Sequence, residues 1–226
     1  MDRVEPRPSQ KISIPVVAPI LTRSIVTKSP LDETRRPTRA EAEEAVRTLI
    51  CWAGDDPGRS GMQATPAAVL ESYAERFRGY CQNDDGLAPH WSLEPAPSGE
   101  TVLLRRVPFL SHCEHHMVPF RGAVSIAYKP AETIASVDDL FALVDRCSRR
   151  LQSQERLTSE IASAVESALR PSGLAVVTES EHLCMTLRGI QKHGTTTVTM
   201  KFGGRFRDDL NEREQVLVGL LQPDDC

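Results

Sequence analysis

Apolar residues recur at steps of three and four positions in four segments, and this spacing predicts four amphipathic helices. The first helix is expected after Thr38 and the second after Thr65, because threonine is a good N-cap and a proline follows Thr65 at the first helical position. The other two helices are expected over 137–151 and 158–169. The chain is therefore predicted to hold an early and a later helical pair.

Five other segments are rich in β-branched and aromatic residues, which is typical of strands. They span 101–109, 122–128, 174–178, 184–188 and 195–202. Two strands, two helices and then further strands favour an antiparallel sheet with helices on one face. We therefore expect an α+β fold, preceded by an N-terminal helical pair.

Breaks in the pattern divide the chain into four regions. Residues 1–37 contain six prolines and no lasting periodicity, which is typical of an irregular tail. The helical pair occupies 38–81, and a polar segment, 82–100, connects it to the rest. The α+β domain is expected to span 101–226, and it contains the residues best suited to chemistry.

Composition narrows the class of protein. Of the 226 residues, 40% are hydrophobic and 26% are charged, which is a globular balance. A net charge of -4 and the lack of an apolar run of about 20 residues argue against nucleic-acid and membrane partners. We expect a cytoplasmic protein. Six cysteines are too few for a disulfide scaffold, so in a reducing compartment they are metal ligands or spectators.

Histidine and cysteine gather in two short segments that are far apart in the sequence. Cys113 and His116 stand three positions apart between two predicted strands, and Cys184 follows His182 much later. Zinc favours nitrogen and sulfur ligands, and a catalytic zinc keeps three protein ligands and a water. The spacing leaves two interpretations open: a three-ligand zinc site, or a buried cysteine with two hydrogen-bonded histidines.

The segments around these residues resemble motifs of the GTP cyclohydrolase I family. The similar segments are 111–119 (SHCEHHMVP), 127–130 (AYKP), 154–158 (QERLT), 182–192 (HLCMTLRGIQK) and 195–199. The resemblance runs from about residue 40 to about residue 217. It implies the tunnelling fold (T-fold) and a homodecamer with active sites between subunits. It also implies hydrolysis of GTP to 7,8-dihydroneopterin triphosphate and formate, at the entry to folate and biopterin synthesis.

The resemblance assigns a metal and two proton-handling groups. Cys113, His116 and Cys184 match the ligands of a Zn²⁺ cofactor, and His115 and His182 match the histidines that transfer protons. Zinc lowers the pKa of bound water to about 7, and the resulting hydroxide would add to C8 of guanine. An imidazole that titrates near pH 6.5 would protonate N7 and later help to open the imidazole ring of guanine.

Substrate contacts follow from the same motifs. Glu155 matches the carboxylate that holds guanine, and Gln154 beside it helps to line the base pocket. One carboxylate can accept hydrogen bonds from both N1–H and the 2-amino group of guanine. Arg188 matches a basic phosphate contact, and Asp138 stands where the family has a serine implicated in the ribose rearrangement.

Four positions at which the family holds the triphosphate with basic side chains carry other residues here. They are Ala68, Glu71, Asp139 and Ala142. At about 5 Å and an effective dielectric constant of about 20, each lost attraction is on the order of 3 kcal/mol before screening. We therefore predict a guanine substrate without a triphosphate, namely a free base, a nucleoside or a monophosphate.

Three alternatives remain open. Other basic residues would hold the phosphates of GTP itself, some of them from a neighbouring subunit; the candidates are Arg121, Lys129, Arg146, Arg149, Lys192, Lys201 and Arg205. The chain would otherwise be a degenerate copy without activity. In the third alternative it is a non-catalytic zinc-binding subunit that assembles with, or regulates, a conventional paralogue.

Overall fold

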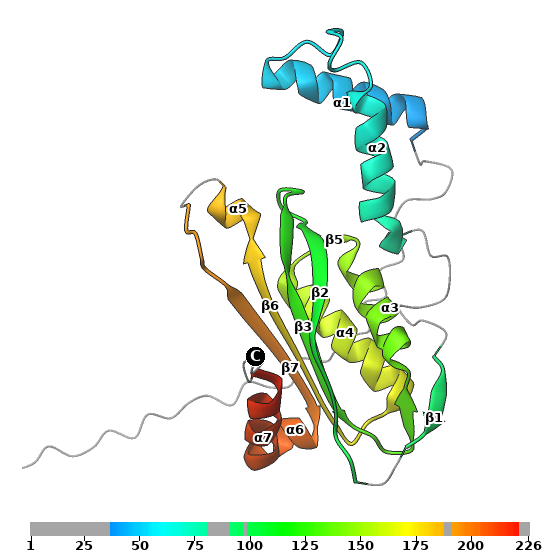
Figure 1. Ribbon diagram of the computed structural model, residues 1–226, viewed down its shortest axis with the longest axis vertical. Helices are drawn as coiled ribbons and strands as arrows, with labels where there is room; N and C mark the ends of the chain where they lie inside the picture. Colours follow the sequence, from blue (N-terminus) through cyan, green and yellow to red (C-terminus); the bar gives the residue numbers. More distant parts are fainter. Residues whose placement is uncertain (1–36, 81–90, 97–98, 188–190, 222–226) are drawn as a thin grey trace, which may run out of the picture. The chain divides into compact units, whose positions relative to one another are not determined.

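A five-stranded sheet in the order β5-β2-β3-β6-β7 forms the centre of the fold (Figure 1). The computed structural model describes residues 37–80, 91–96, 99–187 and 191–221; Arg188 and nearly all of the predicted tail lie outside these ranges. The strands are β2 (Val102–Cys113), β3 (Pro119–Lys129), β5 (Leu151–Gln152), β6 (Gly173–His182) and β7 (Thr197–Gly204). All neighbours pair antiparallel except β5, which runs parallel to the end of β2.

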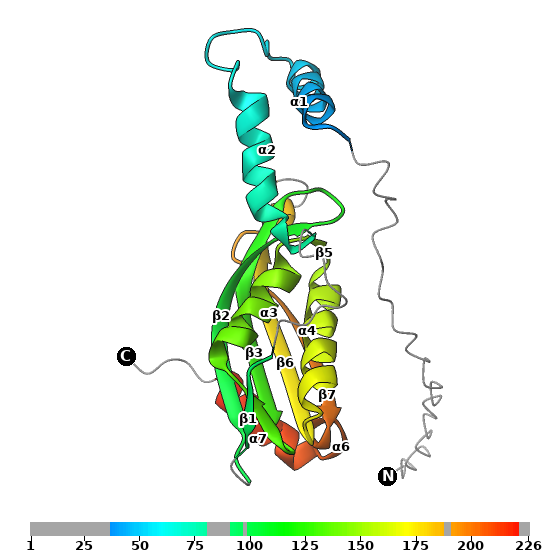
Figure 2. The same ribbon diagram turned by 90° about the vertical axis from the view of Figure 1, so that its right-hand side faces the viewer.

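Two helices, α3 (Val137–Ser148) and α4 (Gln154–Leu169), lie side by side on one face of this sheet (Figure 2). Alternate strand residues point toward them, so that Val124, Ile126 and Tyr128 are fully buried. Burying such an apolar side chain contributes about 1.5–3 kcal/mol. The predicted α+β architecture, with an antiparallel sheet and a covering helix pair, is confirmed.

The C-terminal helices were not predicted. α6 (Arg205–Asp208) and α7 (Leu210–Leu221) cover one end of the opposite face of the sheet. There, Phe206 and Val216 pack against Ala127, Ala175 and Val177, which alternate with the residues that face α3 and α4. Only two residues of α7 are buried, so the helix has no long apolar face. Its sequence therefore lacks the regular spacing of apolar residues by which a helix is predicted.

The early helical pair is confirmed. α1 (Arg39–Ala53) starts with a complete capping box in which Thr38 and Glu41 exchange hydrogen bonds. α2 (Thr65–Arg76) begins one residue earlier than expected, with Ala64 rather than Thr65 as its N-cap. A short 3-10 helix, η2 (Arg78–Tyr80), follows. Within the parts of the chain described above, no helix has both the length and the apolar character needed to span a bilayer.

One predicted strand is wrong. Residues 184–188 were expected to be extended, but β6 continues to His182 and a single helical turn, α5 (Leu183–Thr186), follows it. A short apolar run fits the residue spacing of a strand and of a helix equally well. Here the helical turn places Cys184 near Cys113 at the end of β2. The two remaining strands, β1 (Leu93–Pro95) and β4 (Thr133–Ala135), pair with each other outside the main sheet.

Candidate metal centre

Three side chains from separate segments converge at one end of the sheet. Cys113 ends β2, His116 lies in the turn that follows it, and Cys184 lies in α5. One ligand atom from each lies within 4.8 Å of the other two, and the distance from Cys113 Sγ to His116 Nδ1 is 3.8 Å. The structure thus brings together the three residues that the sequence proposed as metal ligands.

A tight turn aims the two histidines. The backbone N–H groups of Cys113 and Met117 donate to the carbonyls of Val118 and Cys113, at 2.9 and 2.8 Å. Met117 has a φ of 54°, in the left-handed region, which lets the chain double back. His115 and His116 are exposed as a result, and the Nδ1 atom of His115 lies 3.5 Å from Cys113 Sγ.

The donor set suits zinc. Two thiols and one imidazole are the ligand types that zinc prefers, and three protein ligands leave a fourth position open. Ligand atoms around one tetrahedral zinc lie about 3.5 Å apart, close to the Cys113–His116 separation of 3.8 Å. The site is therefore chemically and geometrically able to hold this metal.

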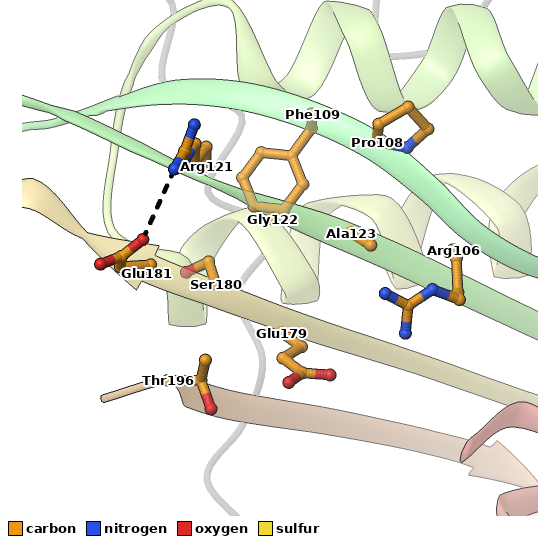
Figure 3. Close-up of a pocket in the computed structure, with 10 residues that line it drawn as sticks. All are labelled: Arg106, Pro108, Phe109, Arg121, Gly122, Ala123, Glu179, Ser180, Glu181 and Thr196. Atoms are coloured by element: carbon orange, nitrogen blue, oxygen red, sulfur yellow. Dashed lines mark ion pairs between the residues drawn. The ribbon is translucent and has the colours of Figure 1, made fainter. Parts of the chain in front are cut away.

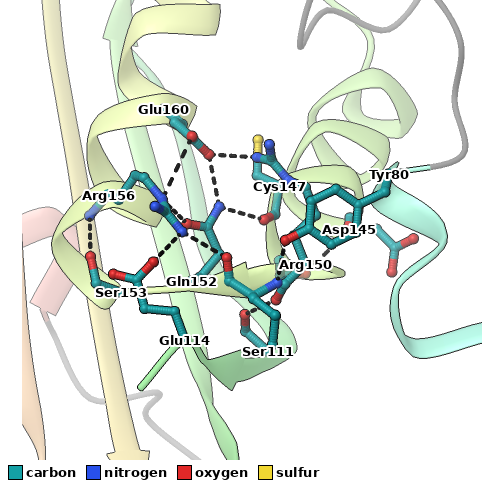
Figure 4. A network of polar contacts seen from close by, with 12 residues as sticks. Tyr80, Ser111, Glu114, Asp145, Cys147, Arg150, Gln152, Ser153, Arg156 and Glu160 are labelled. Carbon is teal, nitrogen blue, oxygen red and sulfur yellow. Dashed lines mark hydrogen bonds and ion pairs between the residues drawn. The ribbon is translucent and has the colours of Figure 1, made fainter. Parts of the chain in front are cut away.

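A polar network ties the metal-binding turn to α4 (Figure 4). Arg156 contacts the Glu114 carboxylate at 2.8 Å and donates to Gln152 Oε1 at 2.7 Å. Gln152 also donates to Glu160 at 2.8 Å, and its carbonyl accepts from the Glu114 N–H at 3.0 Å. These bonds fix the backbone between Cys113 and the two histidines relative to the helix.

His182 lies beside this cluster at the end of β6. Its ring stacks on Phe120 with a centroid separation of 4.6 Å and an interplanar angle of 3°. Its Nε2 lies 2.9 Å from the side-chain oxygen of Gln154. Burial lowers the pKa of His182, and the charge of Glu155 opposes this shift in part.

The two residues predicted to bind the base differ in exposure. Glu155 is exposed in the first turn of α4, where its charge acts on His182. Gln154 is only 1% exposed, and every hydrogen-bonding atom of its amide has a partner within the protein. Glu155 is thus free to meet a ligand, whereas the Gln154 side chain acts inside the fold.

Asp138 lies far from the metal cluster within one chain. It is exposed in the first turn of α3, which follows β4, and the Ala135 N–H of β4 donates to the Tyr128 hydroxyl. Tyr128 lies nine positions along β3 from Pro119, which pairs with His112 beside the cluster. Nine strand residues span about 30 Å, so Asp138 and the metal cluster occupy opposite ends of the sheet.

The acidic residues at the positions where the family resemblance implies phosphate contacts have partners of their own. Asp139 accepts a hydrogen bond from the Ser92 N–H at 2.7 Å, which ties the segment before β1 to α3. Glu71 pairs with Arg39 at 3.3 Å and so links α2 to α1. Both side chains therefore contact other parts of this chain at positions where the family resemblance implies lysine.

Several alternative phosphate-binding residues are already paired with carboxylates. Arg121 lies 3.8 Å from Glu181, and Arg149 lies 2.6 Å from Asp145. Lys129 and Arg205 both contact Glu212. These pairs weaken, within one copy of the chain, the interpretation that basic residues elsewhere replace the lost phosphate contacts.

A pocket of about 480 Å³ lies on the other face of the sheet (Figure 3). Its lining includes Arg106, Arg121, Glu179 and Glu181. The two glutamates alternate along β6 with the residues that contact α4, so the pocket faces away from the metal cluster. None of the residues predicted to bind metal, transfer protons or bind the base lines it.

Sequence reasoning missed three residues of this site. Phe120 stacks on His182, and Glu114 and Arg156 form the ion pair that anchors the turn. Side chains alternate between the two faces of β3, and this alternation places Phe120 on the face that α3 and α4 cover. Nothing in the spacing of Glu114 and Arg156 could have paired them, although both lie within the quoted motifs.

The chain is similar to known proteins over most of its length. The family model described as GTP cyclohydrolase I matches residues 42–220. The GTP cyclohydrolase 1 of Sinorhizobium fredii is 45% identical over 86% of this chain and 96% of its own length. That of Allorhizobium ampelinum is 45% identical over 80% of this chain and 90% of its own. Among solved structures, the archaeosine synthase QueF-Like in its apo form covers 48% of this chain and 97% of its own, with 20% identity and a TM-score of 0.39.

Proposed function

Because the chain belongs to the GTP cyclohydrolase I family, whose hydrolases act on cyclic amidine C–N bonds, we propose that it opens the imidazole ring of a guanine compound that lacks a triphosphate. The observation that carries the first part is the convergence of Cys113, His116 and Cys184 within 4.8 Å. The observation that carries the second part is the loss of basic residues at the former triphosphate positions.

Zinc is the cofactor in this proposal, held by Cys113, His116 and Cys184. When bound, it supplies Lewis acidity that makes a water molecule nucleophilic near neutral pH. The protein contributes the orientation of the ligands, because the turn after β2 is closed by backbone bonds and braced by Arg156. Support of this kind around metal ligands strengthens metal binding and activity.

The neighbouring side chains divide the remaining tasks. Glu155, exposed at the start of α4, accepts hydrogen bonds from N1–H and the 2-amino group of guanine. His182 and His115 transfer protons at the ring atoms during opening. Gln154, which is buried in the fold, holds His182 in place through their contact at 2.9 Å.

Assembly completes the site. Within residues 99–187 and 191–221, the outer edge of β7 has no strand partner, and β2 pairs with β5 at two residues only. Open edges of this kind invite pairing between copies, and repeated pairing closes a ring. We propose a homodecamer with the T-fold, in which the Asp138 end of one copy adjoins the metal cluster of another.

The charges of four side chains argue against a substrate that carries a triphosphate. Ala68, Glu71, Asp139 and Ala142 offer no cation to a polyphosphate, and Asp138 adds a further negative charge. Asp139 and Glu71 are also held in contacts within the chain. Ring opening needs only the metal cluster and its neighbours, so it does not depend on residues that bind phosphates. The later rearrangement of the sugar is a separate step, and ring opening does not require it.

A substrate panel tests the proposal. The zinc-loaded protein is incubated with GTP, guanosine monophosphate, guanosine and guanine, and ring opening is followed by ultraviolet spectra and formate release. We expect at least one of the three compounds without a triphosphate to show a kcat/KM at least tenfold above that of GTP, because repulsion replaces attraction at the phosphates. A higher kcat/KM for GTP would contradict the proposed substrate, and inactivity toward all four would favour a non-catalytic zinc-binding subunit.

A further inference from the structure

Gln154 lies inside the protein, where the start of α4 meets β6 and β7. Its side chain is 1% exposed, and its amide contacts both strands. A buried amide that is fully hydrogen-bonded is held in one orientation, because any rotation leaves polar atoms without partners.

The partners of the amide determine which way it faces. Gln154 Nε2 lies 2.9 Å from the backbone carbonyl oxygens of Thr178 and Thr197. A carbonyl oxygen only accepts hydrogen bonds, so the atom that faces both of them must be the NH₂ group. The amide oxygen therefore faces the other side, where it accepts from Ser180 Oγ at 2.7 Å and lies 2.9 Å from His182 Nε2.

The amide oxygen in turn determines the tautomer of His182. Because that oxygen only accepts, His182 Nε2 must carry a hydrogen, and a neutral imidazole carries only one. We propose that Gln154 is a positioning residue that keeps His182 in the Nε2–H tautomer, so that Nδ1 is the atom that exchanges a proton with the substrate. This inference rests on the proposed function, which gives His182 its role in proton transfer.

The orientation of the ring agrees with this assignment. Stacking on Phe120, at 4.6 Å and 3°, fixes the plane of the imidazole, and the bond to Gln154 fixes its rotation within that plane. In the transfer, the N–H bond at Nδ1 of the imidazolium breaks and a bond forms between that proton and a ring nitrogen of the guanine. The ring returns to the neutral Nε2–H form with its bond to Gln154 intact.

The tautomer is measured directly by long-range ¹H–¹⁵N spectroscopy of the full-length protein labelled with ¹⁵N-histidine. The signal of His182 is identified by its loss in a His182→Gln variant. We expect the Nε2–H form in the neutral state, and a neutral ring protonated at Nδ1 would overturn the proposal. This readout needs no turnover, so it remains decisive even if the substrate panel shows that the proposed function is wrong.

Kinetics separate positioning from binding of the base. Gln154→Leu removes the acceptor at similar volume, and we expect kcat to fall about 100-fold while KM changes less than about threefold, because the proton-transfer step loses its correct tautomer. Zinc content should not change. A large rise in KM with unchanged kcat would instead make Gln154 a binding residue and contradict the proposal.

Thr199→Val is the matched control. Thr199 Oγ1 accepts from the same amide at 3.2 Å and contacts Thr158 Oγ1 at 2.6 Å, but its hydroxyl is bonded to neither His182 nor Ser180. We expect kcat to stay within about twofold of the wild type. If Gln154→Leu does not fold, the tautomer of His182 in the wild-type protein still decides the proposal, because that measurement needs no variant of Gln154.

Discussion

Replacing Cys184 with serine is expected to remove both the metal and the activity. Two ligands, Cys113 and His116, would remain, and a serine hydroxyl does not ionise near neutral pH as a metal-bound thiol does. We expect bound zinc to fall from about one per chain to below about a tenth, and ring opening to fall at least 1000-fold. Metal analysis of the dialysed protein and formate release measure the two effects.

Cys51→Ser provides the control for this substitution. Cys51 is an exposed cysteine of α1, so the same chemical change there should leave zinc content and activity unaltered. Cys147 is fully buried in the core and does not belong to the cluster of Cys113, His116 and Cys184, and burial raises the pKa of its thiol to about 12. Full retention of zinc by Cys184→Ser would contradict the assignment of the metal site.

The double substitution Ala68→Arg and Glu71→Lys is expected to make GTP a much better substrate. It adds positive charge to α2 at two of the positions where the family resemblance implies phosphate contacts. With solvent screening, each restored attraction is worth about 1–1.5 kcal/mol, so the KM for GTP should fall about 100-fold. The KM for guanosine should not change, because it carries no phosphate.

Glu214→Lys controls for the general effect of charge. Glu214 is exposed on α7, so this substitution reverses a charge away from α2 and should leave both KM values within about twofold. The loss of the exposed Glu71–Arg39 pair costs at most about 1 kcal/mol of stability. Thermal unfolding of the double variant should therefore resemble that of the wild type. An unchanged KM for GTP in the double variant would show that α2 does not face the phosphates.

The fold was predictable wherever side-chain periodicity was strong. Val124, Ile126 and Tyr128 alternate cleanly and lie in a buried strand, and Thr38 caps α1 as expected. The segment after His182 was not predictable, because five apolar-rich positions fit a strand or a helical turn equally well. The position of α7 depends on a few contacts across the sheet, which no local pattern encodes.

The candidate site was predictable in its residues and not in its contacts. Cys113, His116 and Cys184 could be proposed from ligand chemistry and the family motifs, and the structure brings them together. The inward orientation of Gln154 could not be foreseen, since it depends on carbonyl groups of two strands that are distant in sequence. The separation of Asp138 from the metal cluster likewise depends on the direction of β3.

X-ray absorption at the zinc edge of the full-length, zinc-loaded protein tests the central claim most directly. We expect the zinc to have two sulfur ligands at about 2.3 Å, one imidazole nitrogen at about 2.0 Å and one further light atom as neighbours. In Cys184→Ser, any residual zinc should show at most one sulfur. A wild-type spectrum with only nitrogen and oxygen neighbours would contradict the account.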